Sequence, residues 1–407
     1  MIVWGAVPGR AKSISSPRPP FGRLAFSIAA RSVHWSPGLA LTETGRGIVL
    51  SSTARYAHIV GNWFGVAGDG TPASYTGKAG VWIGSAPSNL VGVEAPANAT
   101  TPVSAPVADR NVFAGFFDGV VIYGPTAIGN RVANNLFGML PDGSRREHRC
   151  NAVDLNSGPD RNTIGGDTAS QRNRIGSALC DGIELSHGYD PARDPFTDPG
   201  AYGEPWPISR NRIVGNWIGF TATGGFDPLY VPGRLRSPDD GSGINVIDGS
   251  SRNVIEKNRI TGALQGIAVW HDHTGANVIR NNVIGIAPDG GAAPPGNWGV
   301  LVRFRAVGNQ ITGNRIGWAG LGGIGVTGHR TVHTRISRNT FTDLRGNLAI
   351  DLEPFGKPNP PHGPKPLVAA NQGIDAPRLL KATTRLVTGT ALVGARIEVF
   401  ASNGPAG

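Results

Sequence analysis

The sequence is poor in several residue types, and each shortage narrows the structures that it can form. Only 2 of its 407 residues are methionine and 7% are aromatic, which argues against a helical core packed by long flexible side chains. No run approaches the roughly 18 apolar residues of a membrane-spanning helix. Only 16% of the residues are charged, whereas 60 are glycine and 32 are proline. This composition indicates a chain rich in turns and strands.

A repeat organises the middle of the chain. The pattern Asn-x-Ile-x-x-Asn-x-Ile occupies residues 253–260 and returns 24 positions later at residues 277–284. A period of about 20 to 50 residues indicates a solenoid. Aliphatic residues two positions apart, as in Ile267 and Val269, predict short strands and not helices. Stacked copies would share one core of aligned Ile and Val, and their asparagines would form internal ladders.

A Gly-aliphatic-x-aliphatic motif, called here the strand motif, extends the repeat in both directions. It runs from Gly47 to Gly323 and closes at residues 349–352, which predicts about ten coils. Gly/Pro/Asp turns explain the longer spacings and are expected to leave the stack on one side as a rim, at residues 65–70, 138–143, 219–224 and 285–290. The longest spacing, 61 residues, holds an excursion that includes residues 187–207, and long loops on a rigid scaffold often bind ligands.

The two ends of the chain do not follow the repeat. Residues 1–44 are expected to be an irregular basic segment without a convincing signal peptide, which leaves a truncated or misassigned start open. Residues 45–352 are expected to form the solenoid. Residues 353–372 form a Pro-rich linker, and residues 373–407 are predicted to be a partial, truncated module of the β-sandwich type.

The repeat resembles the right-handed parallel β-helix repeat family of bacterial secreted and cell-surface proteins, which includes pectate-lyase-like solenoids. The resemblance rests on Asn162-Thr-Ile-Gly-Gly166, on Asn216-Trp-Ile-Gly219 and on the closing segment Asn347-Leu-Ala-Ile-Asp-Leu352. It implies an all-β, right-handed, single-stranded parallel β-helix that is extracellular or on the cell surface. It does not imply one activity, because such helices host lyases, hydrolases, epimerases and adhesins. The motifs of polygalacturonases, of pectate-lyase calcium sites and of alginate-type epimerases are missing.

Two acids occupy equivalent positions of consecutive strand motifs and are the candidate catalytic residues. Alignment of the motifs places Asp154 and Glu184 side by side on the outer face, about 4.8 Å apart. This is near the carboxylate spacing of a retaining glycosidase, and each acid would favour protonation of the other. Asn245 follows in register, and His187 begins the loop that would overhang the pair. The alternative is that these acids are ordinary polar surface residues.

Further candidate binding residues follow the strand at residues 265–269. Trp270 and, one coil later, Arg303 and Arg305 could contact sugar and its carboxylates. If the strand continued, His271 and His273 would point to one side and could share a divalent cation, although no third ligand is evident. Solvated turns and surface arginines are the alternatives, and no cofactor is otherwise expected.

The two cysteines precede equivalent strand motifs. Stacking would bring the Cα atoms of Cys150 and Cys180 to about 5 Å, within the range of a disulfide, although a stacked pair of free thiols remains an alternative. An oxidising compartment would favour the bridge.

These observations leave three functions open. The net charge of +10 suits a polysaccharide or another anionic surface polymer, whereas nucleic-acid motifs are missing. We therefore expect a surface scaffold that binds polysaccharide through its loop rim. The alternatives are a hydrolase or lyase of acidic polysaccharide and a structural spacer in a larger surface protein.

Overall fold

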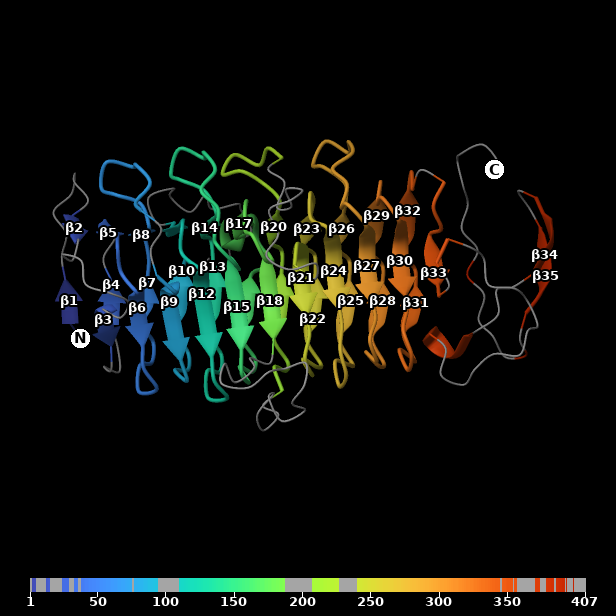
Figure 1. Cartoon of the computed structure of the whole chain (residues 1–407), viewed down its shortest axis with the longest axis horizontal. Coiled ribbons are helices and arrows are strands. Elements are labelled where there is room, and N and C mark those ends of the chain that lie inside the picture. Colours follow the sequence, from blue (N-terminus) through green and yellow to red (C-terminus); the bar gives the residue numbers. More distant parts are fainter. Residues whose placement is uncertain are drawn as a thin grey trace.

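Three long parallel sheets run side by side along the chain in a computed structural model (Figure 1). The structure describes residues 38–74, 77–93, 110–186, 207–226, 240–344 and 346–353, the backbone of four earlier strands, and short stretches between residues 355 and 398. Each turn of the chain adds one strand to sheet A, then one to sheet B, then one to sheet C. Within the described residues each sheet has 11 strands. The fold is thus the expected right-handed parallel β-helix.

The strands of each sheet are short and follow one another in chain order. Sheet A contains β1 (Ile2–Trp4), β4 (Val33–Trp35), β7 (His58–Ile59), β10 (Leu90–Gly92), β13 (Arg131–Ala133), β16 (Thr163–Gly165), β19 (Arg212–Val214), β22 (Val254–Glu256), β25 (Val278–Arg280), β28 (Gln310–Thr312) and β31 (Arg335–Ser337). Sheet B contains β2 (Lys12–Ile14), β5 (Leu39–Leu41), β8 (Trp63–Phe64), β11 (Val112–Phe113), β14 (Leu136–Phe137), β17 (Arg174–Ile175), β20 (Trp217–Ile218), β23 (Arg259–Ile260), β26 (Val283–Ile284), β29 (Arg315–Gly317) and β32 (Thr340–Thr342).

Sheet C carries the strand motifs. It contains β3 (Leu24–Ile28), β6 (Arg46–Leu50), β9 (Ala79–Gly84), β12 (Asp118–Tyr123), β15 (Val153–Asn156), β18 (Ile183–Ser186), β21 (Ser242–Val246), β24 (Gln265–Val269), β27 (Trp298–Val302), β30 (Gly322–Val326) and β33 (Ile350–Leu352). Outside the three sheets lie the short 3-10 helices η2 (Ala169–Gln171) and η3 (Ala370–Gly373) and an antiparallel pair, β34 (Arg378–Ala382) and β35 (Val387–Thr390).

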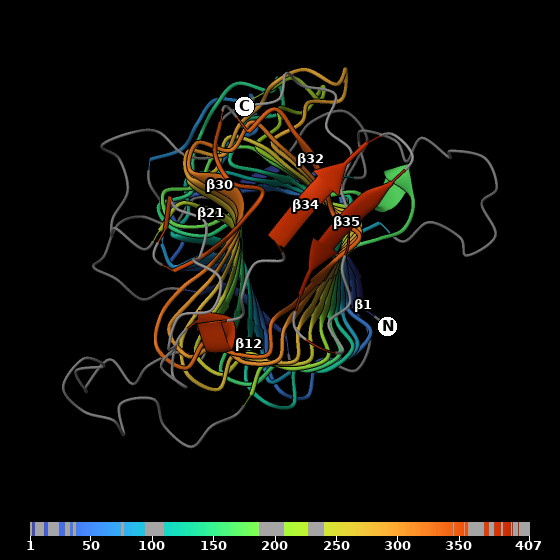
Figure 2. The ribbon, with the colours of Figure 1, turned by 90° about the vertical axis from the view of Figure 1, so that its right-hand side faces the viewer.

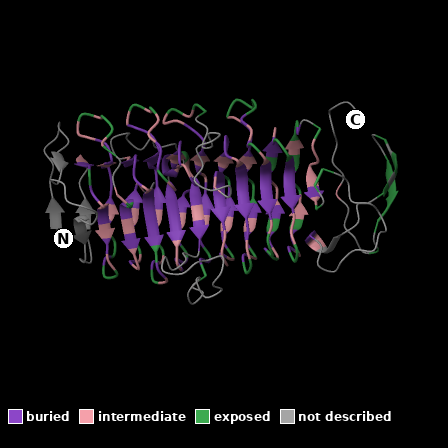
Figure 3. Ribbon diagram, in the orientation of Figure 1, coloured by how far each residue is buried: buried purple, intermediate pink, exposed green. Residues whose placement is uncertain are grey.

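The three sheets surround one elongated space (Figure 2), and buried residues lie along all three of them (Figure 3). Alternation along each strand sends one set of side chains inward, where equivalent residues of successive coils stack, as Ile244, Ile267 and Val300 do. The glycine of the strand motif is required by close approach of the coils. A Cβ at Gly266 would collide with the carbonyl oxygen of Gly299 in the next coil.

Two asparagine ladders hold the coils together, as the repeat predicts. In each ladder the side-chain amide of one coil donates to the Oδ1 of the next, mostly at 2.9 to 3.1 Å. One ladder, between sheets A and B, comprises Asn62, Asn111, Asn135, Asn173, Asn216, Asn258, Asn282, Asn314 and Asn339. The other, at the entrance to sheet A, comprises Asn89, Asn130, Asn162, Asn211, Asn253, Asn277 and Asn309.

The predicted rim is also present. Small hairpins follow β8, β14, β20 and β26 and all leave the stack on the same side, at the top of Figure 1. Each is closed by one antiparallel bridge, such as Phe220 with Phe226. Asp289 illustrates the turn chemistry, because its side chain accepts a hydrogen bond from the backbone nitrogen of Gly291 at 2.8 Å.

The prediction for residues 1–44 was wrong in one respect. Strands β1 to β4 pair in parallel with later strands, so this segment extends the solenoid instead of remaining irregular. The alternation Leu24-x-Phe26-x-Ile28 is a strand signal, but it lacks the glycine of the strand motif. At the other end, β34 and β35 provide a hairpin within the expected module. No helix of the described residues is long and apolar enough to cross a membrane.

Candidate functional site

The outer face of sheet C carries a cluster of carboxylates in its middle coils. Val153 and Leu155 point into the core, so the residue between them, Asp154, points outward. Asp154 pairs in register with Glu184, and Glu184 pairs with Asn245. The spacing of the strand motifs therefore places these three side chains on consecutive strands of one face.

A second row of polar residues lies beside the first, and sequence reasoning missed it. Asp118, Asn151 and Asp181 each come directly before the first residue of a strand motif. The side-chain oxygen of each accepts a hydrogen bond from the backbone nitrogen of the next coil, at 2.7 to 3.0 Å. Alignment of the residue that precedes each strand motif would have revealed this row. Asp118, Asp154, Asp181 and Glu184 are called here the carboxylate cluster.

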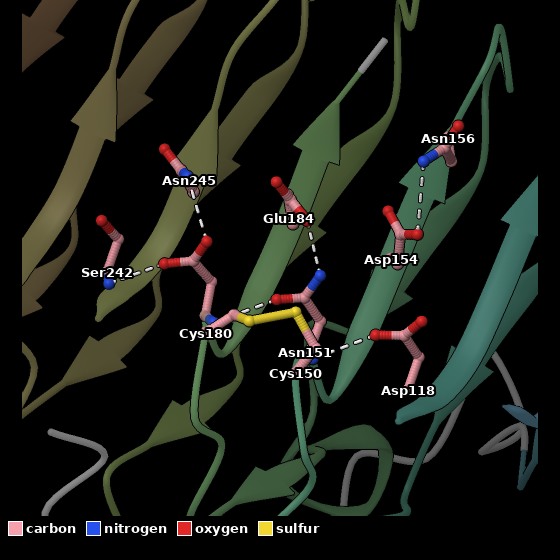
Figure 4. The surroundings of a disulfide bond; sticks show 10 residues. Asp118, Cys150, Asn151, Asp154, Asn156, Cys180, Glu184, Ser242 and Asn245 are labelled. Atoms are coloured by element: carbon pink, nitrogen blue, oxygen red, sulfur yellow. Dashed lines mark hydrogen bonds between the residues drawn. A yellow bond between two sulfur atoms is a disulfide. The ribbon is translucent and has the colours of Figure 1, made fainter. Parts of the chain in front are cut away.

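Neutral amides hold the carboxylates in place (Figure 4). Asn151 Nδ2 donates to Glu184 Oε2 at 2.5 Å, and Asn245 Nδ2 donates to Asp181 Oδ2 at 3.0 Å. None of Asp154, Asp181 and Glu184 forms an ion pair with a basic residue that the structure describes. The amides fix the geometry of these acids but do not neutralise their charge.

Burial and mutual repulsion favour the protonated forms of these acids. Burial raises the pKa of Asp154 to about 7 and the pKa of Asp181 to about 8. The pKa of Glu184 is raised well above its usual value, first by burial and then by the charges of Asp154, Asp181 and Asp118. Near neutral pH the group can therefore contain both a proton donor and a proton acceptor, which is what general acid and base chemistry needs.

Some polar atoms of this region have no partner. Oδ1 of Asp154, Oδ1 of Asn245 and Oγ of Ser242 are buried and form no hydrogen bond. Asp154 is 8% exposed and Asn245 is 4% exposed. A buried polar atom without a partner usually costs about 1 to 3 kcal/mol, so such atoms are candidates for contacts with a ligand.

Aromatic side chains lie on one side of the cluster along the same face. The guanidinium of Arg46 lies 4.1 Å from the ring centroid of Trp82, and Trp82 stacks on Tyr123 with centroids 5.3 Å apart. Tyr123 is 41% exposed and pairs in register with Asn156, which follows Asp154 by two residues. A flat apolar surface thus adjoins the acids.

A second aromatic group lies on the other side. Trp270 comes directly after β24, and the guanidinium of Arg303 lies 3.5 Å from its ring centroid. Phe304 meets the Trp270 ring edge-on at 6.5 Å. The structure therefore brings together Trp270 and Arg303, two of the candidate binding residues. Arg305 lies in the following turn, where it forms an ion pair with Asp272 at 3.2 Å.

The histidines do not form the metal site that continuation of the strand would produce. β24 ends at Val269, and both His271 and His273 have positive φ, so they belong to a turn. His271 Nδ1 instead lies 2.6 Å from Asp248 Oδ1. No group of three or more metal-binding side chains occurs among the residues that the structure describes. His187, the predicted binding residue of the long loop, lies outside them.

A disulfide joins the two coils that carry most of the acids. Cys150 and Cys180 are bonded, with Cα atoms 4.4 Å apart, and they directly precede Asn151 and Asp181 (Figure 4). The bridge therefore links the coil of Asp154 to the coil of Glu184. It restricts relative movement of the two strands on which the acids depend for their spacing.

Comparison with known proteins concerns the architecture only. No protein-family model matches the chain, and no curated protein matches it significantly. Among solved structures, PfbA, a surface adhesin of Streptococcus pneumoniae, is 10% identical, with a TM-score of 0.45 over 91% of this chain and 88% of that one. An alginate lyase from Paenibacillus is 12% identical, with a TM-score of 0.37 and coverages of 77% and 93%.

A third structure adds the same information. The A-module of the mannuronan C-5 epimerase AlgE4 of Azotobacter vinelandii is 11% identical, with a TM-score of 0.35 over 80% of this chain and 86% of that one. All three TM-scores are below 0.5 and all three identities are at most 12%, so these likenesses say nothing about function.

Proposed function

We propose that the protein cleaves glycosidic bonds of a polysaccharide on the outer face of sheet C, with Asp154 and Glu184 as the reacting carboxyl groups. The observation that carries this proposal is the carboxylate cluster. Within it, Asp154, Asp181 and Glu184 are neighbours, have raised pKa values and form no ion pair with a described basic residue; Asp154 and Asp181 are buried and Glu184 is half-buried. A surface with a purely structural role does not require these carboxylates, because amide or apolar side chains at the same positions would lower the stability of the fold less.

The two acids have different roles in this proposal. Glu184, whose pKa is raised by burial and by its acidic neighbours, holds a proton and donates it to the leaving oxygen. Asp154, with an unpartnered Oδ1, is the ionised group that attacks the anomeric carbon and forms a glycosyl ester as the bond to the leaving oxygen breaks. Water that gives a proton to Glu184 then hydrolyses this ester, which releases the sugar and restores both carboxyl groups. Strands of a parallel sheet lie about 4.8 Å apart, which is close to the separation of about 5 Å in retaining enzymes. We therefore expect retention of the anomeric configuration.

The polysaccharide would lie along the solenoid axis. Trp82 and Tyr123 offer apolar surface to sugar rings on one side of the acids, and the exposed Phe304 beside Arg303 does so on the other. From β12 to β27 there are five strand steps, or about 24 Å, enough for several sugar units. Uncompensated carboxylates repel anions, so the sugar at the reacting position should be neutral, while Arg303 could accept an acidic one further along.

Binding without turnover is the second candidate function. The Trp82 and Tyr123 stack favours it, because an exposed aromatic platform binds sugars whether or not the acids react. In that case the protein is a scaffold at the cell surface or outside the cell, for which the disulfide and the basic charge are supporting observations.

The test is the release of products from neutral and acidic polysaccharides. Wild-type protein, Glu184→Gln and Asp289→Asn would be incubated with each polymer, and reducing ends and unsaturated uronate absorbance would be followed. Asp289 lies in an exposed hairpin, so its variant controls for the removal of one carboxylate elsewhere. We expect new reducing ends from the wild type and the control, and a loss of at least about a hundredfold in Glu184→Gln.

Two outcomes would contradict the proposal. Equal turnover by Glu184→Gln and wild type would place the chemistry elsewhere. Absence of turnover on every polymer, combined with binding that Trp82→Ala weakens, would favour the non-catalytic scaffold.

A further inference from the structure

The outer face of sheet B carries a row of basic residues. In each middle strand of this sheet the second residue is fully buried in the core, as Ile175 and Ile218 are, so the first residue points outward. Register pairing along β14, β17, β20, β23, β26 and β29 aligns the outward residues Leu136, Arg174, Trp217, Arg259, Val283 and Arg315. Three arginines therefore share one narrow strip with a tryptophan.

Two further arginines enlarge this strip. Arg110 and Arg172 each directly precede a ladder asparagine at the turn into sheet B. The charge of Arg110 acts on Arg174, and the charge of Arg174 acts on Arg172, so the side chains lie near one another. Arg110, Arg172, Arg174, Arg259 and Arg315 are called here the arginine stripe.

The stripe contains no compensating acid among the described residues. Hydrogen bonds join its described arginines to neutral acceptors. Arg110 Nε donates to Asn134 Oδ1 at 3.1 Å, Arg172 Nε donates to the carbonyl of Gly215 at 3.3 Å, and Arg259 donates to the carbonyls of Ile286 and Ala287 at 2.8 and 2.9 Å. None of the five guanidinium groups forms an ion pair with a described carboxylate.

This arrangement is electrostatically unfavourable in the free protein. Burial and, to a smaller extent, the charges of Arg174 and Arg259 lower the pKa of Arg172 to about 10. Burial and the charge of Arg315 likewise lower the pKa of Arg259. The stripe thus gathers partly desolvated like charges.

Sheet A shows the opposite arrangement. There Arg212 contacts both Asp167, at 2.6 Å, and Glu256, at 2.5 Å, and Arg280 contacts Glu256 at 2.7 Å. These arginines of sheet A thus form ion pairs with acidic residues of other coils, whereas the described part of the arginine stripe contains no acidic residue.

Trp217 sits in the middle of the stripe. The guanidinium of Arg172 lies 4.2 Å from its ring centroid, and that of Arg174 lies 5.6 Å away. The hairpin after β20 approaches the ring closely, because a Cβ at Gly224 would lie 2.9 Å from it. Trp217 is therefore held as a fixed flat surface between cations.

We propose that the arginine stripe binds an acidic polysaccharide lying along the solenoid axis. Guanidinium groups grip carboxylate or sulfate groups through paired hydrogen bonds, and the flat face of Trp217 suits a sugar ring. From β17 to β29 the stripe spans four strand steps, about 19 Å, which matches a polymer with several anionic groups better than a single small anion. Single-stranded nucleic acid fits less well, because its binding uses several stacked aromatics and the stripe offers one.

The stripe lies on a different sheet from the carboxylate cluster, so this inference goes beyond the proposed function. The arginine stripe would hold the protein on an anionic surface, while the outer face of sheet C remains available to another polymer. Its failure is distinguishable from failure of the cleavage proposal, because binding at sheet B and product release at sheet C are measured separately.

The test compares two double variants that lose the same charge. Arg174→Gln with Arg259→Gln alters the stripe, whereas Arg330→Gln with Arg335→Gln removes two exposed arginines elsewhere. Labelled polygalacturonate, dextran sulfate, neutral dextran and a single-stranded oligonucleotide are titrated with each protein at about 50 and 200 mM salt. We expect the wild type to bind the two acidic polymers and not neutral dextran. The stripe variant should bind roughly tenfold or more weakly, and the control variant nearly as well as wild type.

Three results would overturn the inference: equal affinities of the two variants, tighter binding of the oligonucleotide than of either acidic glycan, or no binding of acidic glycan by the wild type. Thermal melting guards against misfolding. Because the stripe variant loses repulsion between like charges, it should melt at or above the wild-type temperature in the absence of polymer. If the double variant melts lower, the single variant Arg174→Gln is used in the same titration.

Discussion

Replacement of Asp154 by asparagine should stabilise the protein at neutral and alkaline pH. An unfolded Asp154 has its ordinary pKa of 3.8, whereas burial raises the pKa in the folded protein to about 7. Below the lower value both states are protonated, and the aspartate costs nothing. As the pH rises through the interval, the unfolded state ionises first, so the folded state loses stability until the pH passes the folded pKa.

The size of the effect follows from the two pKa values. A difference of about three pKa units corresponds to at most about 4 kcal/mol of unfolding free energy. The gain in Asp154→Asn should therefore be close to zero near pH 4, increase up to about pH 7 and then stay constant. Loss of this charge also relieves its repulsion of Glu184, which adds to the gain at a pH at which Glu184 is ionised.

Urea denaturation followed by circular dichroism at about pH 4, 7 and 8.5 measures this gain. Asp289→Asn, which changes an exposed carboxylate in a hairpin, is measured alongside as the matched control. A gain of equal size at acidic and alkaline pH would refute the reasoning, because packing and not ionisation would then explain it. Destabilisation of Asp154→Asn at about pH 8.5 would show that the ionised form is well accommodated. Loss of turnover in the stabilised variant would show that the carboxylate needed for activity lowers the stability of the fold.

Three further predictions concern the solenoid. Asn258→Ala removes the side chain that donates to the carbonyl of Ile213 at 2.9 Å, so it should cost about 3 kcal/mol or more in urea unfolding, because buried groups lose their partners. Loss of the Cys150 and Cys180 bridge in the double serine variant should cost about 3 kcal/mol and lower the melting temperature, whereas two free thiols in non-reducing mass mapping of exported protein would contradict the bridge. Burial lowers the pKa of His148 to about 4, so stability should be lost as the pH falls from about 6.5 to 4, and His148→Phe should weaken this dependence in thermal melts.

Much of the fold was predictable because each coil contacts only its neighbours. Residues at equivalent positions of successive repeats therefore lie side by side on neighbouring strands, which is why the strand motifs predict the register of Asp154 with Glu184. The asparagine ladders and the single-sided rim follow from the same relation. The first strands were missed because they lack the glycine on which the motif depends.

Other features depended on where strands end and turns begin. The metal hypothesis for His271 and His273 assumed that β24 continues, whereas positive φ turns the backbone immediately after Trp270. Asp118 and Asp181 were overlooked because they precede the strand motif, yet their side chains join the same outer face. The direction that the backbone takes at a turn between strands cannot be read from the two-residue alternation within a strand, because that alternation does not show where the strand ends.

The sequence by itself determined the solenoid, its core and its ladders, since these repeat with the chain and need only neighbouring coils to agree. Apart from the pair Asp154 and Glu184, only the tertiary structure decided which charges meet. Arg174 and Arg259 are 85 residues apart, yet they occupy one face. Burial, repulsion and the lack of counter-charges among the described neighbours arise from side chains brought together across coils. Stacking of the coils thus gathers charges that are scattered along the sequence into an acidic outer face on sheet C and a basic outer face on sheet B.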